Sequence, residues 1–190
     1  MRLEALYVLA LSTGIREGEL LGLKWREVDL DAGSIHIQQT LKVAGQGKRV
    51  LGKPKTAGSR RKIMLTKMGI AALRAHRTSQ LEERLQSPAR HDNDLVFANT
   101  VGNVLDPTNL YRYDYKPLLR RAGLPLIRLN DLRHTAATLL LLSGVHPKVV
   151  SEKLGHSSVS ITLNLYSHVL PDMQASATNA MEQLLGETFG

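Results

Sequence analysis

Cysteine is absent from the 190 residues, which excludes disulfide bonds, thiolate metal sites and cysteine nucleophiles. Long apolar runs are also absent: the longest, residues 139–142, is far shorter than the roughly 20 residues that cross a bilayer. The N-terminus has no signal-peptide pattern. We therefore expect a cytoplasmic protein without membrane association, long enough to bury the core of one domain.

Positive charge is concentrated in one segment. The chain has 25 Lys and Arg against 17 Asp and Glu, and residues 48–67 hold eight of these cations and no acid. Such a field attracts polyanions, and duplex DNA is the commonest in a cell. A solvated basic loop without a partner is the alternative. The predicted DNA-binding side chains are Lys48, Arg49, Lys53, Arg60, Arg61 and Lys62.

Apolar periodicity and turn residues predict an α+β domain that is mainly helical, with a small three-stranded antiparallel sheet. The first half should hold helices at residues 3–11, closed by Gly14, and at 16–23. Strands follow at 34–41, 48–51 and 62–65, with the basic segment forming a second hairpin. Thr66 should cap a long helix that ends near Ser87.

The second half should be helical. Asp106 and Pro107 open a helix to about residue 122, and Asn130 with Asp131 caps another that stops at residue 143. Shorter helices follow at 147–155 and after Ser157 or Ser158. A last amphipathic helix, in a tail of residues 171–190, could dock on its own domain or on a neighbour.

Arg16 and Arg133 each stand at the start of a predicted helix, where backbone N–H groups already favour an anion. Two guanidinium forks could neutralise a pentacoordinate phosphorus. The alternative for Arg16 is a surface ion pair with Glu17 or Glu19.

Tyr166 is a candidate nucleophile on a short helix. A phenol has a reference pKa of about 10, so it needs positive neighbours or a base to react near neutrality. The alternative is a half-buried packing residue on an amphipathic helix.

Four sequence stretches decide between these alternatives. They are TGIREGEL at residues 13–20, PKT at 54–56 with Ser59 and Arg61 following, DLRHT at 131–135, and LGH at 154–156, ten residues before Tyr166. Together, and in this order, they resemble the tyrosine recombinases, the phage integrase family. The resemblance covers nearly the whole chain and implies the catalytic domain of that family over residues 1–170.

The resemblance implies a role for each matching residue. Arg16 and Arg133 would bind the scissile phosphate, and Tyr166 would attack it to give a 3′-phosphotyrosine and a free 5′-hydroxyl. Lys55 would protonate the leaving oxygen, a plain phosphate contact being the alternative, and His156 would hydrogen-bond the phosphate unless it simply ends a helix. Two residues would support the site: Glu19 by orienting Arg16, and His134 by bracing it.

The chain departs from the family pattern in two ways. Asn130 stands where the family usually has a histidine, and an amide cannot exchange a proton near neutral pH. His134 lies about 100° around the helix from Arg133, so we do not expect it to substitute. The core-binding domain that usually precedes this domain is also missing, which points to an excised piece or a truncated gene.

The resemblance implies site-specific recombination of double-stranded DNA, by integration or excision, in a homotetramer on DNA that is monomeric as an isolated domain. No cofactor is expected, and no metal, because the other histidines are scattered. One alternative is a DNA-binding remnant of an integrase with weak or no catalysis. The other is a type IB topoisomerase, which relaxes supercoils without a partner.

Overall fold

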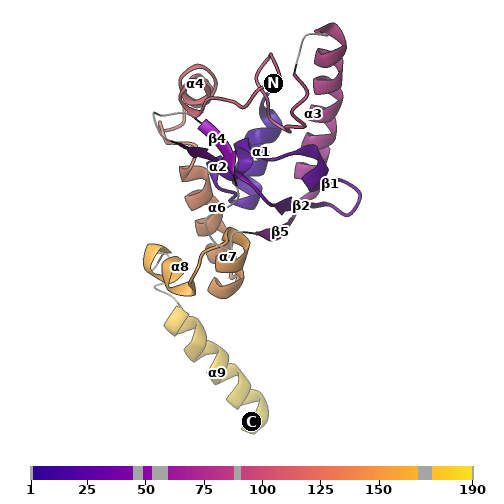
Figure 1. Ribbon diagram of the computed structural model, residues 1–190. Coiled ribbons are helices and arrows are strands. Elements are labelled where there is room, and N and C mark those ends of the chain that lie inside the picture. The colour runs from indigo at the N-terminus through magenta and orange to yellow at the C-terminus, as the bar shows by residue number, and fades with distance from the viewer. Residues whose placement is uncertain (1, 45–48, 53–59, 88–90, 167–172, 190) are drawn as a thin grey trace.

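The computed structural model describes residues 2–44, 49–52, 60–87, 91–166 and 173–189. Figure 1 shows a mainly helical body crossed by short strands, from which the last helix projects. The helices are α1 (Glu4–Thr13), α2 (Glu17–Leu21), α3 (Lys67–Gln86), α4 (Pro107–Leu110), α5 (Lys116–Arg121), α6 (Asp131–Leu142), α7 (Pro147–Leu154), α8 (Val159–Tyr166) and α9 (Met173–Phe189). A 3-10 turn, η1 (Trp25–Glu27), follows α2, and a π-helical turn, η4 (Tyr111–Tyr115), joins α4 to α5.

The strands form a sheet and a separate ribbon, both antiparallel. In the sheet, β2 (Ser34–Ile37) lies between β1 (Val28–Asp29) and β5 (Arg61–Met64). The ribbon consists of β3 (Thr40–Val43) and β4 (Arg49–Gly52). Ile35 pairs with Ile63 on the buried face of the sheet, whereas the next pair, His36 and Lys62, is exposed. This alternation fixes the register, because a shift of one residue would expose the isoleucines.

The predicted α+β fold with a three-stranded antiparallel sheet is confirmed, but two details of the strand prediction are wrong. The single strand expected at residues 34–41 is divided into β2 and β3, which belong to different sheets. The basic segment does not form a hairpin of its own, because β4 pairs with β3 and β5 pairs with β2.

The helix at residues 3–11 is confirmed as α1, which is buried on several sides. Leu6 and Leu9 are fully buried, and α1 contacts both α3 and α6. A second, smaller apolar cluster joins α6, α7 and α8; its buried members are Ala137, Leu141, Val150, Leu154 and Tyr166. This second cluster holds the end of α8 against the body, and with it the side chain of Tyr166.

Gly14 ends α1 in the left-handed conformation, with φ of 64°. A Cβ atom there would lie 2.6 Å from Cδ2 of Leu154, at the end of α7. Only glycine permits both the backbone conformation and this approach. The ends of α1 and α7 therefore meet, although they are far apart in the sequence.

Helix starts were predicted with mixed success. Thr66 caps α3 as expected, its Oγ1 accepting a hydrogen bond from the Gly69 N–H at 3.0 Å. The start of α6 at Asp131, with Asn130 as its N-cap residue, is confirmed, although the side chain of Asn130 makes no capping hydrogen bond. The carboxylate of Asp131 instead accepts from the Arg128 N–H at 2.8 Å and from Nη2 of Arg128 at 3.0 Å. The start expected at Pro171 lies outside the described residues.

Candidate active site

Arg16 immediately precedes α2 and is held from two directions. Its Nη1 donates to Oε1 of Glu19 at 2.9 Å, and its Nη2 donates to the backbone carbonyl of Gly155 at 2.6 Å. Oε2 of Glu19 also accepts from the Arg16 backbone N–H at 3.2 Å. The Arg16 side chain is still 37% exposed, so part of it remains open to a ligand.

Arg133 reaches the same region from the first turn of α6. It is only 6% exposed, and its Nη1 donates to the carbonyl of Gly14 at 2.7 Å. Burial, and after it the charges of Arg16 and Arg61, together lower the pKa of Arg133 to about 10. A guanidinium in such surroundings gains strongly from an anion, which would offset both the burial and the repulsion.

Arg61, on β5, has an internal partner rather than a surface position. Its Nη1 and Nη2 donate to Oε1 and Oε2 of Glu19 at 3.1 and 2.9 Å, and its Nε donates to the carbonyl of Lys153 at 2.9 Å. Its side chain is 8% exposed. The fork of Arg61 is therefore engaged inside the protein, where it fixes Glu19, which favours an internal role over the predicted contact with DNA.

Glu19 is thus the carboxylate around which the arginines gather. Burial raises the pKa of Glu19, but hydrogen bonds and charge from Arg61 and then Arg16 outweigh burial and lower it overall. One carboxylate faces the three guanidinium groups of Arg16, Arg61 and Arg133. The excess positive charge makes this region a prepared anion site, in which a phosphate needs little reorganisation of the protein.

His156 follows the left-handed Gly155 that ends α7. Its Nδ1 lies 2.8 Å from Oγ1 of Thr162, a fully buried residue of α8. Burial lowers the pKa of His156 to about 4, and the charges of Arg133, Arg16 and Arg61 contribute. The imidazole is therefore neutral near pH 7, and with Nδ1 engaged by Thr162 its Nε2 is the nitrogen left for a ligand.

Tyr166 ends α8 and is 3% exposed, so the packing alternative describes its ring correctly. Its hydroxyl is engaged as well: Oη lies 2.8 Å from Nδ1 of His134. Burial raises the pKa of Tyr166, and the positive charge of Arg133 only partly opposes this. The resting phenol is therefore protonated near neutral pH.

His134 lies elsewhere than its sequence neighbour Arg133 suggests. The turn of about 100° along α6 carries its ring away from the guanidinium, but toward α8 and the hydroxyl of Tyr166. The expectation that His134 does not substitute at the site considered only its own helix. A partner on a second helix makes it a neighbour of the candidate nucleophile.

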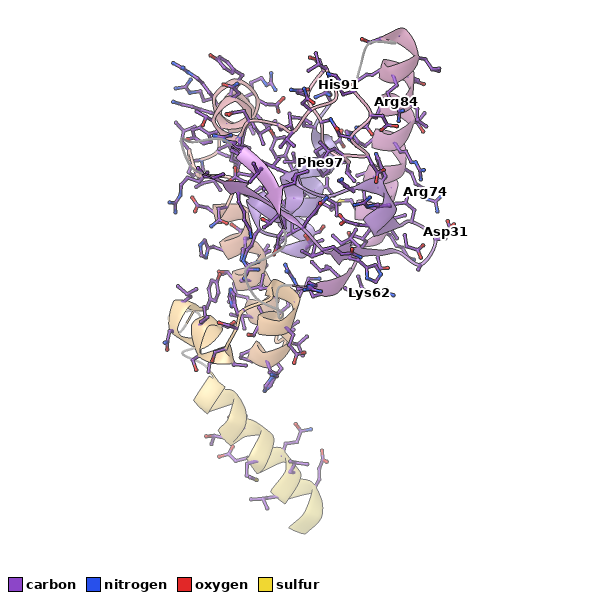
Figure 2. All side chains as sticks on the ribbon, viewed as in Figure 1. Asp31, Lys62, Arg74, Arg84, His91 and Phe97 are labelled. Atoms are coloured by element: carbon purple, nitrogen blue, oxygen red, sulfur yellow. The ribbon has the colours of Figure 1, made fainter. Side chains whose placement is uncertain are left out.

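The remaining predicted site residues are only partly described by the structure. Lys55, together with Lys48 and Lys53, lies outside the described residues. Arg49 lies with its Nη1 2.7 Å from Oδ2 of Asp106, so its charge is already paired. Arg60 and Lys62 are exposed, and Figure 2 shows Lys62 pointing outward from β5. Asn130 is half-buried one turn before Arg133, and its carbonyl accepts from the Arg133 N–H at 3.1 Å.

Sequence reasoning missed three participants. The carbonyls of Gly14 and Gly155 hold Arg133 and Arg16, and Thr162 orients His156. Both glycines lie in the quoted stretches, but they were interpreted only as helix ends. The signal available in the sequence was position: Gly14 stands two residues before Arg16, and Gly155 immediately precedes His156.

The described residue ranges show neither a membrane span nor a metal-binding cluster. No helix there is long and apolar enough to cross a membrane. Within the same ranges, His, Asp and Glu side chains form no group that could hold a metal ion. The expectation of a metal-free site stays a prediction.

A helical domain in which arginines lie near a buried tyrosine is typical of domains that catalyse reactions at phosphate groups. Comparison with known proteins gives the family. The model of the phage integrase family matches residues 1–173. A tyrosine recombinase XerC-like protein of Caldanaerobacter subterraneus subsp. tengcongensis is 40% identical, over 96% of this chain and 50% of that protein. The ICEBs1 integrase of Bacillus subtilis is 28% identical, over 94% of this chain and 48% of that one.

Two solved structures are similar. The XerH site-specific recombinase, bound to palindromic difH substrate in a post-cleavage complex, has a TM-score of 0.64 at 27% identity, over 95% of this chain and 47% of that chain. The Tn1549 transposon integrase with circular intermediate DNA has a TM-score of 0.77 at 23% identity, over 96% and 58% of the two chains, and supports the fold alone. The chain belongs to the phage integrase family, the tyrosine recombinases. It spans about half the length of these curated relatives.

Proposed function

We propose that this chain is the catalytic domain of a site-specific recombinase that cleaves and rejoins double-stranded DNA during integration or excision. Membership of the family supports the reaction class. The XerH complex with its DNA substrate, captured after cleavage, supports DNA as the substrate of the similar domain here.

The observation that carries the proposal is the convergence of Arg16, Arg133 and Tyr166 from separate parts of the chain. Gly155 and Gly14 hold the two arginines through their carbonyls. The three side chains are close enough to interact electrostatically: the charge of Arg133 acts to lower the pKa of Tyr166, and the charge of Arg16 lowers the pKa of Arg133. A candidate nucleophile near two guanidinium forks supports the proposal.

The chemistry follows from these positions. The forks of Arg16 and Arg133 pair with the non-bridging oxygens of the scissile phosphate and stabilise the charge of the pentacoordinate phosphorus. Tyr166 attacks the phosphorus, and the 5′-oxygen leaves with a proton that Lys55 is expected to supply. His156 donates a hydrogen bond from Nε2. The phosphotyrosine conserves the energy of the broken linkage, so the reverse step reseals the strand without a nucleotide.

DNA binding would draw on the basic segment. Arg60 immediately precedes β5 and Lys62 lies on it, and both side chains are exposed. They would contact backbone phosphates, together with Lys48 and Lys53. Recombination needs an active site for each strand that is cut, so we propose a homotetramer on DNA and a monomer in its absence. Figure 1 shows α9 projecting from the body, which is consistent with docking on a neighbour. The reaction would take place in the cytoplasm.

Covalent capture tests the proposal. The chain is incubated with a pool of randomised duplexes that carry a nick in one strand, so that the short 5′-hydroxyl fragment released by cleavage diffuses away. The protein should then appear in denaturing gels as a DNA adduct, and sequencing the trapped DNA identifies the site. Tyr166→Phe should bind DNA without forming the adduct, whereas Tyr113→Phe, which alters an exposed tyrosine, should behave as wild type.

Two outcomes would contradict the proposal and favour one of the alternatives. Binding of the pool by the wild-type chain without any adduct would indicate a DNA-binding remnant. An adduct combined with relaxation of supercoiled plasmids that lack the captured site would indicate a topoisomerase.

A further inference from the structure

The hydroxyl of Tyr166 is hydrogen-bonded to a group that can exchange protons. Its Oη lies 2.8 Å from Nδ1 of His134, and the two ring centroids are 6.0 Å apart. The residues come from different helices, α8 and α6, which the second apolar cluster packs together. The contact is therefore fixed by the fold and does not depend on a flexible side chain.

A proton acceptor is needed at this point. Burial keeps the phenol of Tyr166 protonated, and the nearby Arg133 does not reverse this. A neutral phenol is a weak nucleophile, so its proton must leave as the bond to phosphorus forms. Asn130 cannot accept it, because an amide does not titrate near neutral pH.

Other polar groups of the described site are less suited to this task. The arginines are donors only. His156 has Nδ1 engaged by Thr162 and lies among the guanidinium groups, which disfavour a second positive charge. Tyr166 is hydrogen-bonded to the imidazole of His134 instead.

We propose that Nδ1 of His134 accepts the proton of Tyr166 as the phenol attacks the phosphate, and returns it when the strand is resealed. This rests on the recombinase function proposed above. The Oη–P bond forms, the P–O5′ bond breaks, the phenolic proton moves to Nδ1, and the leaving 5′-oxygen takes a proton from the acid for which Lys55 is expected. In resealing, the 5′-hydroxyl attacks the phosphorus and gives its proton back to the group for which Lys55 is expected. The Oη–P bond breaks, and the imidazolium returns its proton to Oη. No oxidant, metal or nucleotide enters the balance.

The surroundings of His134 bear on its imidazolium in opposite ways. Asp131, on the same helix, interacts favourably with a positive His134, which contributes to the lowered pKa of this carboxyl. The charge of Arg133 opposes a further positive charge in this region, whereas His156, from the turn after α7, is neutral near pH 7 and adds no repulsion. The Arg133 guanidinium also favours the phenolate. A bound phosphate, which brings negative charge, favours the imidazolium.

The test compares His134→Asn with wild type on a nicked duplex from the captured pool. Asparagine places an amide near the position of Nδ1, so it can hold the hydroxyl but cannot take its proton. Adduct formation should slow at least about 100-fold, the lower end of the usual contribution of general base catalysis. The affinity for the uncleaved duplex and the unfolding midpoint should stay near wild type.

A matched control is available in His146→Asn. His146 is an exposed histidine that caps α7, with Nδ1 accepting from the Lys148 N–H at 3.2 Å, and asparagine is an equally good cap. This variant should react at the wild-type rate.

The pH profile separates proton transfer from positioning. In wild type the adduct rate should rise with pH as the acceptor imidazole loses its proton, and then level off. The His134→Asn variant should lack this inflection. A slow variant that keeps the inflection would assign His134 to positioning and overturn the proposal, as would a variant with the wild-type rate and profile.

A duplex with sulfur in place of the bridging 5′-oxygen completes the test. A thiolate leaves without needing an acid, so this substrate bypasses proton donation to the leaving group. It should not restore the rate of His134→Asn, and restoration would assign His134 to the leaving-group side, against the proposal.

If wild type itself binds DNA but forms no adduct, the recombinase function fails. If wild type reacts and only the His134 results disagree, the function stands and this inference fails.

Discussion

Glu19 and Arg61 form a two-point ion pair in the interior, with both carboxylate oxygens within 3.1 Å of the guanidinium nitrogens. Their side chains are 2% and 8% exposed. The same carboxylate holds Arg16, which lies at the open side of the site. The pair therefore links the sheet, through Arg61 on β5, to the position of Arg16, which is proposed to bind the phosphate.

Glu19→Gln should destabilise the fold by about 3 kcal/mol near neutral pH, because it leaves a buried guanidinium without its counter-charge. The Glu19 pKa is lowered from its ordinary value of 4.5, so its stabilising contribution is complete above that pH and is lost as the pH falls below it. The difference in unfolding free energy between wild type and variant, measured in urea, should shrink in that acid range. A difference independent of pH would contradict this.

Arg61→Met and Lys62→Met, at neighbouring positions of β5, should behave in opposite ways. Lys62 is exposed, so its loss should weaken DNA binding and reduce the slope of log Kd against log salt by about 1, with little change in stability. Arg61→Met removes the same charge but should keep the slope, lower the unfolding midpoint and slow adduct formation. A reduced slope for Arg61→Met would show that Arg61 does reach DNA.

The sequence predicted those features whose signals are local. Gly14 ends α1 and Thr66 caps α3 where expected, because each signal depends on a few neighbouring residues. Strand pairing is not local: the sequence predicts one strand at residues 34–41, but β2 and β3 within that range pair with two separate strands downstream. The start of α6 at Asn130 and Asp131 was also predicted, but the side chain of Asn130 makes no capping hydrogen bond, and the carboxylate of Asp131 holds Arg128.

The site divides in the same way. The sequence could identify Arg16, Arg133 and Tyr166 as candidates from the order of their motifs. It could not show that Arg61 is paired with Glu19, or that His134 meets Tyr166, because each contact joins elements brought together only by tertiary packing. The two interpretations of Tyr166, packing residue and nucleophile, were also not exclusive, since its ring is buried while its hydroxyl is engaged.

Gly155→Ala should cost more than Gly123→Ala. Both glycines have positive φ, 69° and 65°, so both substitutions carry the left-handed strain of about 1 kcal/mol. At Gly123 a Cβ meets nothing within 4 Å, whereas at Gly155 it lies 2.9 Å from Nη1 of Arg61, which Glu19 and the Lys153 carbonyl hold in place. Unfolding free energies should show this excess, and only Gly155→Ala should also slow adduct formation. Equal costs would mean that the guanidinium moves aside freely.

Thr162→Val should slow adduct formation roughly tenfold, the equivalent of one lost hydrogen bond of about 1.4 kcal/mol. Valine fills the same buried space but cannot contact Nδ1 of His156, so the imidazole is no longer fixed with Nε2 toward the phosphate. Thr162→Ser, which keeps the hydroxyl, is the matched control and should react near the wild-type rate despite a small cavity. Rates on the captured duplex should be read beside its Kd, because the loss belongs to the transition state and the ground-state affinity should change little. If the valine and serine variants react equally fast, the contact between Thr162 and His156 has no part in catalysis.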